Sequence, residues 1–442
     1  MNAHDSERIK GLLEELGLGE SQQPAEADVI VFNTCTIREK PDQRLAAHLA
    51  QARALKQADP TRVIAVGGCY AEAQRDQLFE RYPFVDVAFG PGSIPHLADW
   101  LGAGGYGTPT HAVSRGRFAE WKHFAGHLPA RRERPFQAWV QISMGCNSAC
   151  SYCIVPSVRG RERSRELDDI LSEVQTLADD GVREVTLLGQ NVNSWGRDLV
   201  PSKPREFAEL LRAVDAIEGV DRIRFTSPHP KDFRQPVIDA MADCDAVCEH
   251  THLPAQSGSS AVLKRMRRTY SRERYIDLAE RMRAQIDGLA LSTDLMVGFP
   301  GESDHDFAET LSLVTEVGFD SAFTFVFSPR QSTEAATLPD QVPDELKAER
   351  IEQLIETVHE TALARNQGRV GGIEDVLVEG TSRTDAELLR GRSRRNTTVN
   401  FTGTAEAGEI VRVSITRATS TTLLGTEVDS QAVYERADAA AV

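Results

Sequence analysis

The sequence lacks the features of a secreted or membrane-spanning chain. It contains no run of about 18 uncharged apolar residues, the length that crosses a bilayer. Its first ten residues are polar and helix-like rather than a charged-then-apolar leader. We therefore expect no membrane association and a cytoplasmic location.

Positive charge and cysteine are also scarce. The 50 Lys and Arg residues are outnumbered by 66 Asp and Glu residues, which gives a formal net charge of −16. This balance excludes a protein that holds nucleic acid by bulk electrostatics, so any such contact must be local. Seven cysteines are too few for a disulfide scaffold, and regular cysteine spacing in a cytosolic chain indicates metal binding or redox chemistry.

What is present is typical of a folded globular chain. The 442 residues are 40% hydrophobic and 26% charged, without an internal repeat or low-complexity tract. At roughly 150 residues per domain, this length predicts about three domains.

Residues 1–101 have the pattern of an open parallel α/β sheet that begins with a helix. Three short apolar runs, at 29–32, 63–66 and 85–89, each lead into a helical stretch. Cys35 and Cys69 lie just beyond two of these runs. Open sheets bind ligands at this edge, so we expect the two thiols to converge there.

The rest of the chain divides into a linker at 102–134, a core at 135–366 and a C-terminal module at 367–435. The core alternates six strand candidates with helices, which predicts a partial (βα)6 barrel: 138–143, 185–188, 222–226, 249–253, 289–296 and 322–327. Short Val- and Thr-rich runs in the C-terminal module predict a small β-barrel: 376–379, 397–401, 410–415 and 422–424.

The strongest chemical signal is Cys146, Cys150 and Cys153, spaced C-x3-C-x2-C in a loop that opens with Gly145. A structural zinc site closes with four ligands, and neither His nor Cys near Cys153 supplies the fourth. A 4Fe-4S cluster can use three cysteines and leave one iron open. Burial as small apolar residues would not explain this spacing among polar neighbours.

With Tyr152 before the last cysteine, this motif resembles the signature of the radical S-adenosylmethionine enzymes. The resemblance implies that the amino and carboxylate groups of S-adenosylmethionine chelate the open iron. One electron from the cluster then cleaves the cofactor to a 5′-deoxyadenosyl radical, and the protein directs it.

Two further segments follow predicted strands and are candidate cofactor contacts. Residues 298–302 open a helix, and the resemblance favours contact with S-adenosylmethionine, through Gly298 and Glu302, over a simple tight turn. Gln190 and Asn191 could equally bind the cofactor or cap the next turn.

Four stretches extend the resemblance to the methylthiotransferases along almost the whole chain: 33–40, 67–71, 224–230 and 293–302. Residues 33–40 and 224–230 are similar to the branch that modifies dimethylallyladenosine. This implies insertion of sulfur at C2 of N6-dimethylallyladenosine at tRNA position 37, followed by methylation. One S-adenosylmethionine would supply the methyl group and a second the radical.

Other functions stay open at this point. Sister enzymes modify threonylcarbamoyladenosine in tRNA or an aspartate of a ribosomal protein. An RNA-binding protein with a structural zinc site would retain the cysteines without radical chemistry. A chain that cleaves S-adenosylmethionine without thiolating tRNA is a third alternative.

The resemblance also implies a second 4Fe-4S cluster in the N-terminal domain, held by three cysteines. Cys35 and Cys69 match two of them. The first belongs to a Gly-Cys-Gln-Met-Asn stretch, whereas this sequence starts at Met1-Asn2. We therefore expect the sequence to be short at its N-terminus by one strand and this cysteine.

The partners implied are the anticodon stem-loop of tRNA and a low-potential electron donor such as a flavodoxin or ferredoxin. We expect the enzyme itself to be a monomer. The C-terminal module resembles the RNA-binding TRAM domain, with a basic cluster that includes Arg392, Arg394 and Arg395. Arg159 and Arg161 follow the cysteine loop and could contact RNA phosphate or cofactor, or only solvent.

Three further features of the sequence are weaker signals. The basic run at 264–268 is a candidate for tRNA contact, although such runs are usually solvated. Cys244 and Cys248 are expected to pack in the core. His229, His250 and His252 flank predicted strand ends, and the sequence assigns them no catalytic role.

Overall fold

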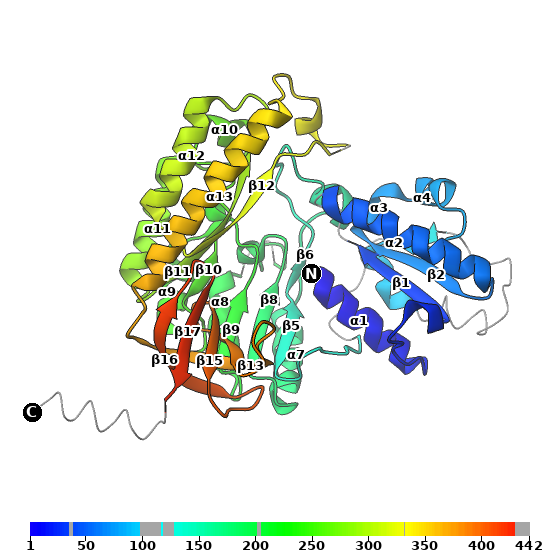
Figure 1. Cartoon of the computed structure of the whole chain (residues 1–442), viewed down its shortest axis with the longest axis horizontal. Helices are drawn as coiled ribbons and strands as arrows, with labels where there is room; N and C mark the ends of the chain where they lie inside the picture. Colours follow the sequence, from blue (N-terminus) through cyan, green and yellow to red (C-terminus); the bar gives the residue numbers. More distant parts are fainter. Residues whose placement is uncertain (35–38, 98–115, 118–127, 201–204, 331, 429–442) are drawn as a thin grey trace, which may run out of the picture.

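The N-terminal part is a parallel sheet with helices on both faces, at the right of Figure 1. The computed structural model describes residues 1–34, 39–97, 116–117, 128–200, 205–330 and 332–428. The sheet order is β1 (Val29–Thr34), β2 (Val63–Gly68), β3 (Val87–Phe89) and β4 (Gly116–Arg117), all parallel. The helices are α1 (Asn2–Glu15), α2 (Glu39–Ala58), α3 (Cys69–Gln74) and α4 (Asp76–Arg81), with 3-10 turns η1 (Pro24–Glu26) and η2 (Pro91–His96). The three predicted strands and the leading helix are confirmed.

The central part contains all six predicted strands, arranged as two parallel three-stranded sheets. One sheet is β5 (Gln137–Gln141), β8 (Glu184–Leu188) and β9 (Arg222–Phe225), and the other is β10 (His250–His252), β11 (Ala290–Val297) and β12 (Ser321–Val326). A parallel bridge between Ile223 and Val247 connects them. Among the described strands, β5 and β12 each pair with one neighbour, so the barrel is partial and open between them.

Helices cover the outside of this half-barrel and bury one large apolar core against the strands. They are α7 (Leu167–Asp179), α8 (Phe207–Asp215), α9 (Gln235–Asp243), α10 (Ser260–Arg265), α11 (Arg272–Gln285), α12 (Asp304–Val317) and α13 (Asp344–Gln367). Short turns η4 (Val192–Ser194), η5 (Pro230–Asp232) and η6 (Glu334–Thr337) lie in the loops. Cys244 and Cys248 are both buried, which confirms their packing role.

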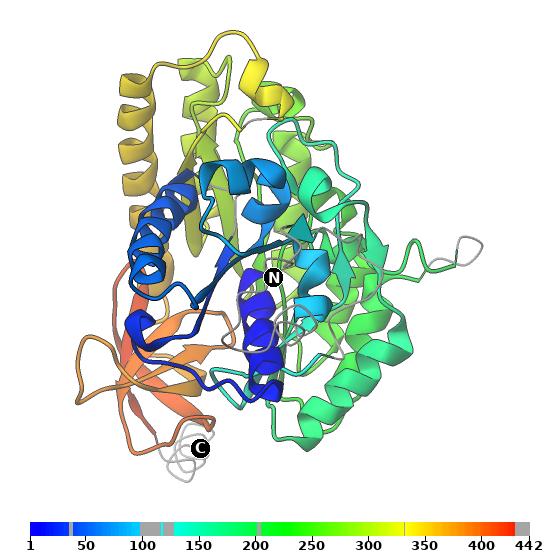
Figure 2. The ribbon, with the colours of Figure 1, turned by 90° about the vertical axis from the view of Figure 1, so that its right-hand side faces the viewer.

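The C-terminal part is a closed five-stranded barrel, drawn in orange and red in Figures 1 and 2. Its strands are β13 (Ile373–Thr381), β14 (Leu389–Ser393), β15 (Thr398–Thr402), β16 (Ile410–Ala418) and β17 (Thr422–Glu427). β14 was not among the predicted strands, because its two arginines and central glycine obscure the alternation that marks a strand.

Charged contacts fix the three parts to one another. Helix α1 lies between the N-terminal sheet and the half-barrel (Figure 1), where Arg8 pairs with Glu173 of α7 at 2.7 Å. Arg222 and Arg224 of β9 donate to backbone carbonyls of the small barrel at 2.7 to 2.9 Å. No helix in the described ranges is long and apolar enough to cross a membrane.

Candidate active site

The cysteine loop leaves the half-barrel just after β5 and is closed at its base by a two-stranded ribbon. β6 (Ser143–Met144) pairs antiparallel with β7 (Arg163–Ser164), and α6 (Val155–Arg159) lies inside the loop. Gly145 has φ +70°, and a Cβ atom there would lie 2.1 Å from the carbonyl oxygen of Arg161. Only glycine fits this close approach, so Gly145 determines how the loop leaves the ribbon.

The three thiols of this loop are half-buried and chemically suited to iron. Burial raises the pKa of Cys153 to about 11, and the neighbouring Cys150 and Cys146 act in the same direction. In the described part of the chain, no three Cys, His, Asp or Glu side chains are gathered closely enough to hold a metal ion as they stand. Binding would therefore draw the thiols together, and a bound iron favours their thiolate form.

Arg268, which was predicted only as a candidate for tRNA contact, is a component of the site. Its guanidinium donates to Cys150 Sγ at 3.5 Å, to the Tyr270 hydroxyl at 2.8 Å and to the Pro254 carbonyl at 3.1 Å. It also lies 5.1 Å from the centre of the Tyr270 ring. A fixed positive charge beside the thiol stabilises a thiolate and a negatively charged cluster. No local motif marks this arginine, since it lies 118 residues from Cys150.

The loop is held by α10. Ser151 donates its hydroxyl to the Arg265 carbonyl at 2.9 Å and its N–H to the Met266 carbonyl at 3.1 Å. Its own carbonyl accepts from Ala335 at 2.8 Å. Ser151 is buried, so this small polar residue between two of the cysteines anchors the loop.

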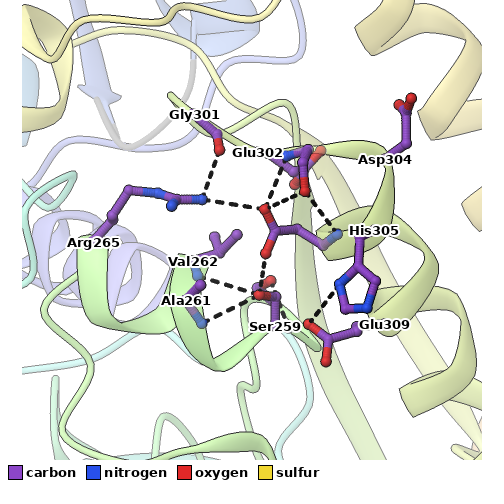
Figure 3. A network of polar contacts seen from close by, with 12 residues as sticks. Ser259, Ala261, Val262, Arg265, Gly301, Glu302, Asp304, His305 and Glu309 are labelled. Atoms are coloured by element: carbon purple, nitrogen blue, oxygen red, sulfur yellow. Dashed lines mark hydrogen bonds and ion pairs between the residues drawn. The ribbon is translucent and has the colours of Figure 1, made fainter.

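A polar network ties α10 in turn to the start of α12 (Figure 3). Ser259 caps α10 by accepting from the N–H groups of Ala261 and Val262, and it donates to Asp306. Arg265 donates to the Gly301 carbonyl at 2.8 Å and to Asp306 at 3.4 Å. The cysteine loop and residues 298–302 therefore share one rigid support.

Gly298 and Glu302 shape their own loop. Glu302 Oε1 accepts from the Gly298 N–H at 2.9 Å and from Arg350 at 2.8 Å. Gly298 has φ +72°, and a Cβ there would lie 2.4 Å from Lys347 Cγ. Burial raises the pKa of Glu302 although Arg350 opposes it. Glu302 Oε1 thus serves the loop, and contact of either residue with a cofactor stays a prediction.

Unpartnered amide atoms mark the carboxyl ends of β5 and β8. Both side-chain amide atoms of Gln141, Oε1 of Gln190 and Oδ1 of Asn191 are buried without a hydrogen-bond partner. Asn191 uses its amino group on Asp232 at 2.8 Å. Buried polar atoms are nearly always satisfied, so these amides fit a polar cofactor that completes their bonds. Gln141 was not predicted, because it lies inside a strand.

Tyr152 lies beside residues 298–302, with its ring 6.3 Å from that of Phe299 in an edge-to-face contact. Burial raises its pKa well above the usual value, so the phenol stays neutral. The structure thus brings Tyr152 and the 298–302 loop together, and the contact of Tyr152 with a cofactor stays a prediction.

The prediction that Arg159 contacts RNA is wrong. Arg159 is 5% exposed, pairs with Asp5 of α1 at 2.7 Å and donates to Cys69 Sγ at 3.4 Å. Its guanidinium connects the loop after the cysteines to the N-terminal domain and is not accessible to a phosphate.

Cys69 begins α3 directly after β2 and is buried, whereas Cys35 lies outside the described residues. Arg161 is exposed, and its contact with RNA stays a prediction.

The basic cluster of the small barrel faces the half-barrel. Arg394 pairs with Glu249 at 2.8 Å and donates to two core carbonyls. Arg392 contacts Glu379 at 3.3 Å, and Arg395 lies 3.6 Å from Glu374. All three are partly exposed, so RNA contact stays a prediction, but Arg394 in particular joins domains.

Inside the half-barrel, a cavity of about 620 Å³ lies between the strands and the small barrel. His250 and His252 line it, both 3.0 Å from Ser292 Oγ. Burial lowers the pKa of His250 well below its usual value. His229 lies outside this lining, and burial lowers its pKa to about 2.

Family models match three parts of the chain. Residues 140–314 match the radical SAM superfamily, residues 1–90 the uncharacterized protein family UPF0004, and residues 367–428 the TRAM domain. These ranges fall within the three predicted domains, whose boundaries stay predictions.

Curated relatives match almost the whole chain under one name, tRNA-2-methylthio-N(6)-dimethylallyladenosine synthase. The protein of Acidothermus cellulolyticus is 48% identical over 432 residues, which cover 97% of this chain and 86% of the relative. That of Carboxydothermus hydrogenoformans is 45% identical over 423 residues, 94% of each. Among solved structures, the radical S-adenosylmethionine methyltransferase TsrM of Kitasatospora setae, with cobalamin and a 4Fe-4S cluster bound, superposes with a TM-score of 0.52. It is 15% identical, covers 74% of this chain and 68% of that one, and shows the fold alone.

Proposed function

The chain belongs to the family of the tRNA-2-methylthio-N(6)-dimethylallyladenosine synthases, and on that premise we propose how its residues carry out the reaction. The chain is a radical S-adenosylmethionine methylthiotransferase that modifies tRNA. Its substrate is N6-dimethylallyladenosine at position 37, and its product carries a methylthio group in place of the C2 hydrogen. This matches the branch predicted from the sequence, and not the threonylcarbamoyladenosine or ribosomal-protein branches.

One observation carries the assignment of the radical site. Cys146, Cys150 and Cys153 lie in a loop that is closed by a ribbon, anchored through Ser151 and contacted by Arg268. We assign these thiols as the ligands of a 4Fe-4S cluster with one open iron. When bound, the cluster and S-adenosylmethionine supply a radical strong enough to remove the unactivated C2 hydrogen of adenine.

The chain's own residues then hold and orient the cofactor. Gln141, Gln190 and Asn191 offer unpartnered amide atoms at the carboxyl ends of β5 and β8. We assign Tyr152 and the loop shaped by Gly298 and Glu302, which lie side by side, as further cofactor contacts. Arg268 stabilises negative charge at Cys150 and keeps that ligand in place.

We assign Cys69 and Cys35 as ligands of a second 4Fe-4S cluster. Support comes from Cys69, which lies at the carboxyl end of β2, buried against Arg159. A positive group donating to sulfur suits a thiolate ligand. The second cluster would serve sulfur transfer, and the first would serve radical formation.

RNA is recognised by local contacts. The anticodon loop is single-stranded, so the target base can leave its stack and enter the protein. We assign the phosphate contacts to Arg161 and to the exposed parts of Arg392, Arg394 and Arg395. A flavodoxin or ferredoxin supplies electrons to a monomeric enzyme in the cytoplasm, where its tRNA substrate is found.

Iron and acid-labile sulfide per chain, after anaerobic reconstitution, test these ligand assignments. Substituting Cys146, Cys150 and Cys153 together by Ala should remove about four irons per chain. The double variant Cys35/Cys69→Ala should lose only the iron of the second cluster and keep the iron bound by Cys146, Cys150 and Cys153. As a matched control, Cys244→Ala should leave the iron content unchanged, because that thiol packs in the apolar core. An unchanged iron content in the triple variant would overturn the assignment.

A further inference from the structure

The half-barrel carries an aromatic side chain that folding alone does not explain. Phe323 of β12 is 59% exposed, although it lines the cavity inside the barrel. Its ring lies edge-to-face against His252, with the centroids 5.7 Å apart. A ligand that covered this ring inside the cavity would recover the free energy that its exposure costs.

Phe323 stands at the open side of the barrel. Of the four strands that end the two described sheets, β9 and β10 are connected by the Ile223–Val247 bridge, so β12 and β5 form the open edges. Trp139 of β5 lines the same cavity. Two aromatic rings therefore flank the opening from its two edges. Glu7 of α1 also lines the cavity, so this side faces the N-terminal domain.

The arginines that line the cavity are already paired with carboxylates. Arg224 pairs with Glu184 at 2.8 Å, and Glu379 pairs with Arg134 at 2.8 Å and Arg392 at 3.3 Å. Burial keeps His250 neutral by lowering its pKa. A phosphate would find little net positive charge here, whereas a neutral heterocycle would find hydroxyls, imidazoles and two aromatic rings.

The cavity also has the size and the neighbours that a base requires. Its volume of about 620 Å³ is in the range of small-molecule sites, which is enough for a nucleoside. Arg392 and Asn396 of the TRAM domain line its floor, so the RNA-binding module is continuous with it.

We propose that Phe323 is the stacking platform for the target adenine, which enters the half-barrel between β12 and β5 with Trp139 on the other side of the opening. This inference rests on the proposed function, because it takes the base of the tRNA substrate as the occupant. Aromatic side chains stack on unstacked bases without requiring a particular charge. Phe323 is thus a positioning and specificity residue, distinct from the cofactor contacts at the carboxyl ends of β5 and β8.

The test measures RNA binding by the full chain with reconstituted clusters, and not turnover. A labelled anticodon stem-loop with dimethylallyladenosine at the target position is titrated with wild-type protein and with Phe323→Ala, Phe323→Tyr and Trp139→Ala. Phe323→Ala should weaken binding by about 5- to 150-fold, the range for loss of one base stack, and Phe323→Tyr should restore it. Ile355→Ala, an exposed apolar residue on α13, is the matched control and should change binding less than about twofold.

A second readout excludes a merely structural effect. With 2-aminopurine at the target position, stacking should quench the fluorescence on wild-type protein, and Phe323→Ala should restore it. If wild type binds the stem-loop and Phe323→Ala binds it equally well, the inference fails while the proposed function stands. If wild type does not bind the stem-loop, both fail. If Phe323→Ala weakens S-adenosylmethionine binding and leaves RNA binding unchanged, the cavity belongs to the cofactor and the inference is overturned.

Discussion

The buried pair of Asp5 and Arg159 should control how firmly the N-terminal domain is attached to the radical core. The two side chains are 2% and 5% exposed and 2.7 Å apart. Burial by itself would raise the pKa of Asp5, but the charge of Arg159 and the neighbouring His4 hold it well below its usual range. The carboxylate is therefore ionised inside the protein and depends on Arg159.

Removing one partner leaves the other charge buried without compensation. Breaking such a pair costs roughly 3 to 5 kcal/mol. Because 1.4 kcal/mol is about a factor of ten, Asp5→Asn should increase the population in which α1 detaches by about 100- to 4,000-fold. Hydrogen exchange of the α1 amides, followed by mass spectrometry, measures this increase as lost protection.

Arg131→Met provides the matched control, because it removes an exposed ion pair with the same helix. Arg131 pairs with Glu14 of α1 at 2.7 Å, but the side chains are 43% and 45% exposed. Exposed pairs contribute about 0.2 to 1 kcal/mol, so protection should fall less than about fivefold. The double variant Asp5→Asn/Arg159→Met should regain part of the protection, because neither charge is then left alone. Equal effects of Asp5→Asn and Arg131→Met would refute the reasoning.

Three further predictions concern the loops and core around the site. Gly145→Ala should sharply reduce iron incorporation, because its Cβ would meet a carbonyl oxygen at 2.1 Å. Gly160→Ala, at a similar φ of +72° but in open space, should retain iron. Iron assays of both variants test this prediction. The pKa of His229 falls from 6.5 to about 2 on folding, so the unfolded chain binds the extra proton and the free energy of unfolding falls as pH drops below 6.5. The free energy of unfolding, measured with urea at pH 6.5 and at pH 5, should therefore fall by about 2 kcal/mol less in His229→Asn than in wild type. An equal fall in both proteins would contradict this prediction. Cys248→Ala should keep full iron content while lowering the unfolding midpoint, and iron loss instead would reveal a metal role for this buried thiol.

The sequence predicted the fold correctly wherever one continuous stretch of residues carries the pattern of an element. Apolar runs followed by helical stretches predicted every strand of the half-barrel and the first three of the N-terminal sheet. β14 was not predicted because Arg390 and Arg392 lie on a partly exposed strand beside Gly391, so its apolar alternation is weak. Pairing in the closed barrel, which involves four other strands, decides its structure.

The site was predictable only where its residues are adjacent in the chain. The three cysteines and Tyr152 share one short motif, but Arg268 reaches Cys150 from 118 positions away. Arg159 had the pattern of a basic edge, and only the docking of α1 shows that it is buried on Asp5. The exposure of Phe323 was not predictable either, since a phenylalanine inside a predicted strand indicates core packing. The open edge of the barrel leaves it exposed.

The central claim is that this chain inserts a methylthio group into tRNA by radical chemistry at Cys146, Cys150 and Cys153. The most direct test incubates the reconstituted protein with S-adenosylmethionine, a low-potential reductant and an anticodon stem-loop that carries N6-dimethylallyladenosine, and then weighs the digested nucleosides. The account predicts a nucleoside heavier by one methylthio group less one hydrogen, absent with the triple Cys→Ala variant and with unmodified adenosine. Formation of 5′-deoxyadenosine without any thiolated nucleoside would contradict it.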